Sequence, residues 1–111
     1  MTGIDLIAAE RKRQIEECGH VAERDDGYPP GELILAALGY GIMYVVANAP
    51  LPTWIRDRLR NDTFTIVWPW RRDTFHSDGA LRDLAKLGAL AAAEADRRLR
   101  LEAKKQEPPP T

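Results

Sequence analysis

Residues 32–48 read ELILAALGYGIMYVVAN, and this stretch decides the fold. From Leu33 to Ala47 it contains no charged residue and no turn signal, which favours a helix over the rival interpretation, a pair of buried strands. Because apolar residues lie all round it, we expect the central helix of the domain, surrounded by the others. The run is closed by Pro50 and Pro52. It is therefore shorter than the roughly 20 residues that a membrane-spanning helix needs.

Downstream, the sequence predicts a long last helix over residues 80–105, with Ser77 or Asp78 as its N-cap. One apolar face includes small residues that let another helix approach closely: Gly88, Ala92 and Ala95. A second apolar set lies on the other side of this helix: Leu87, Leu90 and Leu101. Two apolar faces on one helix indicate a partner chain as well as an internal core, so we expect a homo-oligomer through residues 80–105.

Upstream, residues 3–18 carry a helical apolar stripe, and residues 19–31 are a loop by composition. A short helix is predicted over residues 54–60. The β-branched and aromatic segment 63–70, TFTIVWPW, is expected to be extended, as a strand or an irregular crossing. Residues 106–111, with three prolines, are expected to form a disordered tail.

The bulk composition is that of one ordinary globular domain. The chain has 111 residues, of which 44% are hydrophobic and 30% charged, with a net charge of −1. We therefore expect a single all-α domain over residues 1–105, with three main helices, one short helix and the extended Trp-rich crossing. The absence of a basic excess argues against general nucleic-acid binding. Cys18 is the only cysteine, and no signal peptide is apparent, so we expect a cytoplasmic protein.

Arg11 is the most informative charged residue. At 100° per residue it falls between Ile7 and Ile15, in the middle of the apolar stripe of the first helix. A guanidinium there loses hydration unless an anion meets it. Two interpretations remain open. The first is a structural role: an internal salt bridge to a loop carboxylate, capping of a helix end, or snorkelling to a nearby surface. The second is an arginine that binds a phosphate or carboxylate ligand with its planar fork.

The segment Trp68-Pro69-Trp70-Arg71-Arg72 places two indoles beside two guanidiniums. Such side chains stack on a nucleobase and neutralise phosphate, although they are equally common as core residues or interface anchors. Tyr40 on the central helix is a candidate for the same cavity. The predicted ligand-binding residues are Arg11, Tyr40, Trp70, Arg71 and Arg72.

Acidic residues gather in the loop after the first helix. A hard divalent cation such as Mg²⁺ prefers carboxylate oxygens, and the candidate ligands are Glu23, Asp25, Asp26 and Glu32. His20 lies in the same loop, but the spacing matches no tight metal signature. A solvated acidic loop that pairs with arginines is the alternative interpretation.

Two residues near the start of the last helix are predicted to lie on the surface, without a role in a ligand site. Lys86 lies off the main apolar face, three residues after Asp83, so the sequence predicts an ion pair on the helix surface. His76 is expected to be a surface histidine.

Many of these residues form a pattern that resembles a family of small phage- and prophage-encoded proteins. Its first half reads Glu10-Arg11-x-Arg13-Gln14, Gly19, Asp25-Asp26, Gly31-Glu32-Leu33, Ala36-Ala37 and Tyr40. Its second half reads Trp68-Pro69-Trp70, Asp83-Leu84-x-Lys86, Gly88-Ala89-Leu90, Ala93-Glu94 and Arg97. The resemblance covers most of residues 7–98 and implies a phage context in a bacterial host.

That context implies a first function: a non-catalytic binder, or sponge, that sequesters a nucleotide-like signal of bacterial immunity and uses no cofactor. An alternative is a Mg²⁺-dependent nucleotide pyrophosphohydrolase similar to the MazG type. That family requires a Glu-Glu-x-x-Glu helix, whereas here His20 stands where the third glutamate after Glu16-Glu17 belongs. A third hypothesis is an inhibitor that binds a host protein through exposed tryptophans.

Overall fold

The computed structural model describes residues 1–17, 19 and 22–106, and the described residues contain helices and no strand. The α-helices are α1 (Gly3–Glu17), α2 (Ala22–Asp26), α3 (Glu32–Asn48), α4 (Thr53–Asp62) and α5 (Ala80–Gln106). A π-helical turn, η1 (Thr63–Val67), and a 3₁₀ turn, η2 (Arg72–Thr74), lie between α4 and α5. The predicted all-α class is confirmed.

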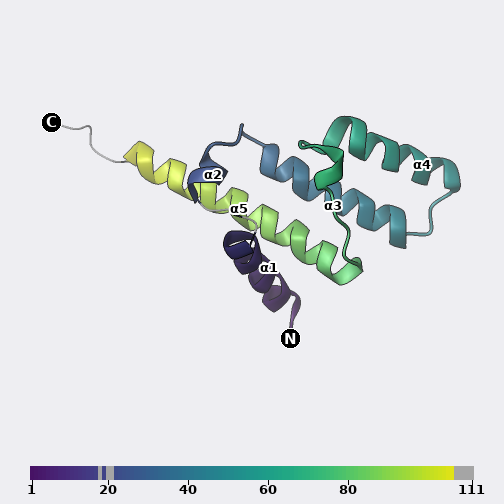
Figure 1. Ribbon diagram of the computed structural model, residues 1–111, viewed down its shortest axis with the longest axis horizontal. Helices are drawn as coiled ribbons and strands as arrows, with labels where there is room; N and C mark the ends of the chain where they lie inside the picture. The colour runs from purple at the N-terminus through teal and green to yellow at the C-terminus, as the bar shows by residue number, and fades with distance from the viewer. Residues whose placement is uncertain (18, 20–21, 107–111) are drawn as a thin grey trace.

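The longest helix, α5, organises the molecule (Figure 1). Its 27 residues correspond to about 40 Å of helix. The α1 and α3 helices both pack against α5, and Figure 1 shows them on opposite sides of it. The α4 helix folds back along α3, while the short α2 contacts α5. None of the helices in the described part of the chain is both long enough and apolar enough to span a bilayer.

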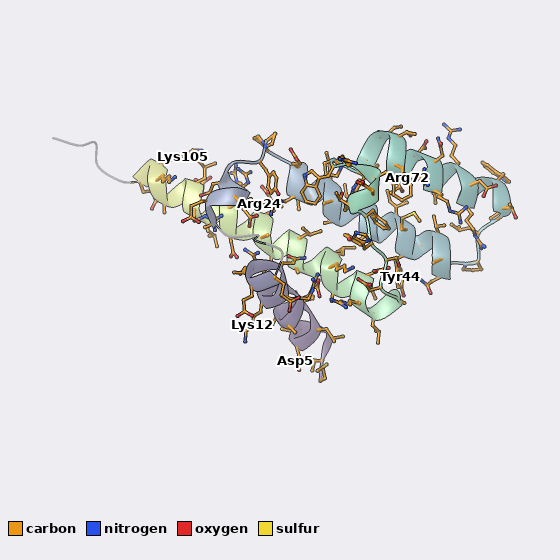
Figure 2. All side chains as sticks on the ribbon, viewed as in Figure 1. Asp5, Lys12, Arg24, Tyr44, Arg72 and Lys105 are labelled. Atoms are coloured by element: carbon orange, nitrogen blue, oxygen red, sulfur yellow. The ribbon has the colours of Figure 1, made fainter. Side chains whose placement is uncertain are left out.

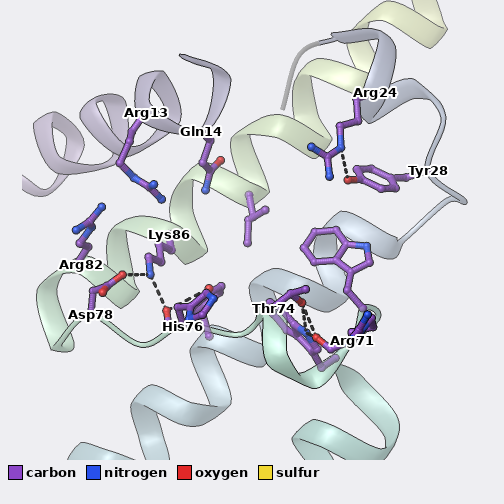
Figure 3. A pocket seen from close by; sticks show the side chains of 14 residues that line it. Arg13, Gln14, Arg24, Tyr28, Arg71, Thr74, His76, Asp78, Arg82 and Lys86 are labelled. Carbon is purple, nitrogen blue, oxygen red and sulfur yellow. Dashed lines mark hydrogen bonds and ion pairs between the residues drawn. The ribbon is translucent and has the colours of Figure 1, made fainter. Parts of the chain in front are cut away.

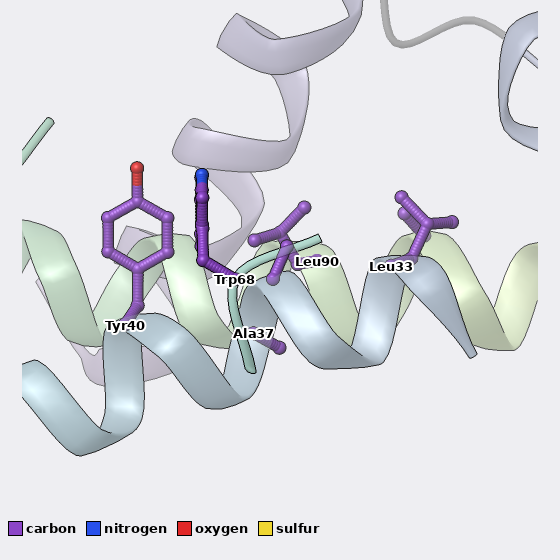
Figure 4. Packing of buried hydrophobic residues seen from close by; sticks show 7 residues of the cluster. Leu33, Ala37, Tyr40, Trp68 and Leu90 are labelled. Atoms are coloured by element: carbon purple, nitrogen blue, oxygen red, sulfur yellow. The ribbon is translucent and has the colours of Figure 1, made fainter. Parts of the chain in front are cut away.

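The hydrophobic core lies between α3, α5 and the segment that follows η1. Figure 4 shows the side chains of this cluster in place on these elements. Its buried members are Leu33, Ala36, Ala37, Tyr40, Trp68, Leu90 and Ala93. A β-carbon at Gly39 would lie 2.7 Å from the Trp68 ring, so the glycine that weakens α3 as a helix allows the indole to pack directly on its backbone.

A second close approach joins α1 to α5. A β-carbon at Gly88 would lie 2.5 Å from Cδ1 of Ile7, so the Ile7 side chain fills the space that a side chain at position 88 would need. The predicted role of Gly88, to let another helix approach, is confirmed.

The structure corrects the prediction that α3 is fully surrounded. Leu35, Leu38 and Val45 are 38%, 50% and 39% exposed, because α3 is covered by α5 on one side and by α4 and η1 on another, and a third side stays open. On α5, Leu81 and Leu99 are each 68% exposed. The molecule thus presents apolar side chains on α3 and α5, its two longest α-helices. Figure 2 draws the side chains on the ribbon.

Two segments differ from their predicted structure. The predicted loop 19–31 contains the α2 helix. Within segment 63–70, the first five residues continue α4 as a π-helical turn, Trp68 is extended, and the chain bends at Trp70. The hydroxyl of Thr63 donates to the carbonyl of Leu59 (2.8 Å), and the Trp68 N–H donates to the Thr63 carbonyl (2.7 Å). These bonds keep β-branched residues helical until the proline that follows Trp68 forces the chain out.

Helix ends agree with the predicted ones to within a few residues. The last helix begins after Gly79, whose φ of +98° favours glycine, so neither Ser77 nor Asp78 occupies its N-cap. Gln106, assigned to the tail, belongs to α5, and residues 107–111 lie outside the described residues. The predicted end of the first helix at Cys18 lies outside them too.

Candidate ligand-binding site

A cavity of about 840 Å³ lies between α1, α3, α5 and the segment that connects η1 to α5. Its volume falls in the upper part of the range of small-molecule sites, roughly 300–1,000 Å³. Figure 3 shows that the side chains around it come from segments distant in the sequence, with α1 on one side and Tyr28 and Arg71 on the other.

One wall of the cavity is aromatic, and its rings contact one another in a chain. Trp70 lies 5.5 Å from Tyr28 and 5.4 Å from Trp68, measured between ring centroids. Trp68 in turn lies 5.5 Å from Tyr40. Because these rings support each other in edge-on and tilted contacts, the wall is assembled before any ligand arrives.

Hydrogen bonds fix the two indoles of this wall. The Trp70 Nε1 donates to Oε1 of Glu32 (2.6 Å), and the Trp68 Nε1 donates to the carbonyl of Arg71 (3.1 Å) and to the hydroxyl of Thr74 (3.2 Å). The polar edges of both rings are thereby satisfied within the protein. Because Trp68 is buried and packs on Gly39, the half-buried rings of Trp70 and Tyr28 offer the larger contact surface for a ligand.

Tyr40 occupies the end of the wall next to α5. Its hydroxyl donates to the carbonyl of His76 (3.3 Å), and Nζ of Lys86 lies 5.2 Å from the centre of its ring. Burial raises the pKa of Tyr40 to about 12, so the phenol is neutral at physiological pH.

The lining carries a strong excess of positive charge. Five of its side chains are lysine or arginine, whereas only one, Asp78, is acidic. The basic residues are Arg13, Arg24, Arg71, Arg82 and Lys86. Such an excess beside aromatic surfaces favours an anionic ligand with a planar group.

Lys86 is the most deeply placed of these cations. It is only 4% exposed, and its Nζ donates to the carbonyl of His76 (2.6 Å) and to the carboxylate of Asp78. This contact holds the pKa of the Asp78 carboxyl below its usual value. Asp83 fixes the loop, because it accepts hydrogen bonds from the Ser77 hydroxyl (2.5 Å) and the Asp78 N–H (3.0 Å). The predicted surface pair of Lys86 with Asp83 is wrong, because both residues are buried and the loop supplies their partners.

The α1 side of the cavity contributes a shared ion pair. Glu10 is buried, accepts a hydrogen bond from Nε of Arg13 (3.0 Å) and lies 3.5 Å from Nε of Arg82. Nη1 of Arg13 also lies 3.8 Å from a carboxylate oxygen of Glu17. Carboxylates of the chain therefore hold both arginines in place on this side of the cavity.

Gln14 lies between these charges and the aromatic wall. It is 5% exposed and points from α1 toward the cavity (Figure 3). Its Oε1 is buried and has no hydrogen-bond partner among the described residues. An acceptor withdrawn from water without a partner is costly, so this oxygen is suited to a donor that a ligand would bring.

Of the predicted ligand-binding residues, Tyr40, Trp70 and Arg71 line the cavity, and Arg72 does not. The Arg72 guanidinium instead lies 4.5 Å from the centre of the Phe64 ring. This contact between the guanidinium and the Phe64 ring accounts for the absence of Arg72 from the lining.

Arg11 also lies outside the cavity lining. Its Nη2 is 3.5 Å from a carboxylate oxygen of Asp25, which is fully buried, and 3.5 Å from one of Asp96. The internal salt bridge, one of the two open interpretations, is what the structure shows. Because Asp25 lies on α2 and Asp96 lies on α5, Arg11 links α1 to both of these helices.

The acidic residues predicted for a metal site have separate protein contacts. In the described part of the chain no three His, Cys, Asp or Glu side chains come together as a metal site would require. Asp26 accepts hydrogen bonds from Arg100 (2.8 and 3.1 Å), Glu32 accepts the Trp70 N–H, and Glu23 is exposed. His20 lies outside the described residues.

Sequence reasoning missed several lining residues, above all Arg13, Gln14, Arg82 and Lys86. Three of them, Arg13, Gln14 and Lys86, belong to the motif pattern on which the phage resemblance rests. Their membership in the same motif pattern as Tyr40 and Trp70 was the signal that could have found them.

In comparisons with protein-family models, with curated proteins and with solved structures, nothing matches this chain.

Proposed function

We propose that this protein is a phage-type, non-catalytic binder of a nucleotide-like anion, which counters bacterial immune signalling by sequestering its messenger. The observation that carries the binding proposal is the composition of the cavity: five basic side chains against one acid, beside a wall of four aromatic rings. Guanidinium forks recognise phosphate oxygens, and indole and phenol faces stack on a base. The phage context rests on the motif resemblance alone.

The binder is favoured over a Mg²⁺-dependent hydrolase by the contacts of the acidic residues. Asp25 faces Arg11, and Asp26 accepts two hydrogen bonds from Arg100. A metal ion would have to displace these guanidiniums before it reached the carboxylates.

A homo-oligomer through α5 is part of the same proposal. Leu81, Leu84 and Leu99 are 68%, 40% and 68% exposed, and a second copy would cover them. Native mass spectrometry of the protein purified from cells tests this together with the ligand: we expect a mass above that of one chain and a retained small molecule. A monomeric mass with no bound molecule would contradict both.

Calorimetric titration with a panel of nucleotides tests the binding itself. Lys86→Gln should weaken nucleotide binding at least tenfold, because Lys86 is buried in the lining, whereas Lys105→Gln near the exposed end of the same helix should not. Circular dichroism establishes that both variants are folded. If Lys86→Gln proves unfolded, Arg82→Gln replaces it, since this side chain is 46% exposed.

The same samples separate the alternatives. Nucleotide that is recovered unchanged after incubation with Mg²⁺ supports the binder, and hydrolysis products support the hydrolase. A host protein that co-purifies while no nucleotide binds would favour the protein-binding inhibitor.

A further inference from the structure

Gln14 brings an unpartnered polar atom to the cavity. It lies on α1, is only 5% exposed, and points toward the cavity (Figure 3). Its Oε1 is buried and accepts no hydrogen bond from the described residues. An acceptor that is withdrawn from water without a donor lowers the stability of the fold. The position of this oxygen therefore points to a donor that comes from outside the chain.

The basic side chains of the lining differ from Gln14, because the chain already supplies them with partners. Nε of Arg82 lies 3.5 Å from a carboxylate oxygen of Glu10, and Nζ of Lys86 donates to the carboxylate of Asp78. These contacts hold the cations in place but do not define the shape of a ligand. The Oε1 of Gln14 is more selective, because an amide oxygen accepts a hydrogen bond and cannot donate one.

The surroundings of Gln14 favour a nucleobase as the source of that donor. The half-buried rings of Tyr28 and Trp70 line the same cavity and offer flat surfaces. A planar base that packs on them turns its edge toward other residues of the cavity, and the N–H donors of a base lie at its edge. A purine covers more of an aromatic surface than a pyrimidine does, because it has two fused rings.

From these observations, and resting on the proposed function, we infer that Gln14 is a specificity-determining residue: its Oε1 accepts a hydrogen bond from an N–H group of a purine base. The base packs on the rings of Tyr28 and Trp70. A nucleotide whose base has no N–H group binds weakly, because it leaves the Gln14 acceptor buried and unpartnered.

The test compares three probes by calorimetric titration: AMP, GMP and purine riboside 5′-monophosphate. All three have the same ribose and phosphate, but only AMP and GMP have N–H groups on the base. We expect the tighter-binding of AMP and GMP to exceed the affinity of purine riboside 5′-monophosphate at least tenfold. If purine riboside 5′-monophosphate binds as tightly as both, the inference is overturned while the proposed function stands. If none of the three binds, both are overturned.

Gln14→Leu gives a second readout. The change removes an unpartnered acceptor, so the melting temperature should stay the same or rise. The tighter-binding of AMP and GMP should lose at least tenfold in affinity, whereas purine riboside 5′-monophosphate should lose none. An equal loss for all three probes would show that Gln14 only shapes the cavity, and would overturn the inference.

Lys12→Gln is the matched control on α1. Lys12 is exposed and does not line the cavity, so this change should leave the three affinities as they are. If Gln14→Leu proves unfolded, Gln14→Met replaces it, because methionine keeps the length of the side chain without the amide. A Gln14→Met protein that still prefers AMP or GMP tenfold over purine riboside 5′-monophosphate would overturn the inference.

Discussion

Two charged regions meet on α1, and they use arginine differently. In the Arg11 cluster (Arg11, Asp25, Asp96), one guanidinium faces two carboxylates, one of which is fully buried. In the cavity, two residues further along the helix, Arg13 also contacts two carboxylates, Glu10 and Glu17, but it belongs to a lining with five basic side chains and one acidic one. Charges that are matched in a buried cluster stabilise the fold, whereas we propose that the basic lining of the cavity meets a ligand. The following predictions test that division.

The largest effect is expected in the Arg11 cluster. Asp25→Ala removes the buried partner of Arg11 and should lower the free energy of unfolding by about 3–5 kcal/mol, measured by chemical denaturation. The exposed Asp57, paired with Arg60, provides a control, and Asp57→Ala should change stability little. A stable Asp25→Ala protein that had lost nucleotide binding would break the comparison, because it would place the cluster in the ligand site.

The second prediction concerns the cavity and the pH dependence of stability that Tyr40 causes. The folded state keeps the phenol proton to a pKa of about 12, whereas an unfolded tyrosine loses it near the ordinary value of 10.0. The contribution to stability is therefore complete below pH 10 and is lost as the pH rises to about 12, a difference of ~2–3 kcal/mol. Across this range the stability of the wild type should fall by ~2–3 kcal/mol relative to that of Tyr40→Phe, as measured by denaturation, and parallel curves would contradict the assignment.

Packing behind the aromatic wall is the next test. Gly39→Ala places a methyl group against Trp68 and should cost about 1–3 kcal/mol and weaken nucleotide binding, since the indole must move. Tryptophan fluorescence would report the displacement. Gly41→Ala is the matched control on α3: its methyl would meet only the flexible end of Leu87, and alanine improves helix propensity. Equal effects of the two changes would mean that the wall tolerates movement of Trp68.

The smallest effect concerns the Asp26–Arg100 pair, in which both side chains are about one-third exposed. Arg100 lowers the pKa of Asp26, so the pair stabilises the fold above the ordinary value of 3.8, and this contribution is lost as the pH falls through the lowered pKa. Arg100→Gln should therefore lower the melting temperature slightly at neutral pH and not in strong acid. A deficit that persists in acid would point to packing instead of charge.

The sequence predicted the elements that local pattern determines. The α3 helix runs from Glu32 to Asn48 as expected, because an uninterrupted apolar run and two following prolines mark its extent. The sequence pattern did not predict α2 or the π-helical turn of Thr63–Val67, because such short elements depend on side-chain hydrogen bonds and on packing against distant helices.

The candidate site was predicted only in part, because the position of several of its residues depends on contacts between distant segments. Arg11 and Arg13 lie about 200° apart around α1, and periodicity alone does not reveal which side faces a cavity. The burial of Lys86 depends on partners in the loop of His76 and Asp78, which no helical pattern encodes. Tyr40, Trp70 and Arg71 were identified because aromatic and basic residue types carry their own chemistry.

The contact between Gly88 and Ile7 has a consequence for the evolution of this fold. The α1 helix brings Arg13 and Gln14 to the cavity, and α1 packs on α5 where position 88 carries no side chain. A side chain at this remote point would shift the helix and change the cavity wall without altering any residue in it. Among descendants of a common ancestor, those that retain glycine at position 88 are the ones in which to look for the same ligand.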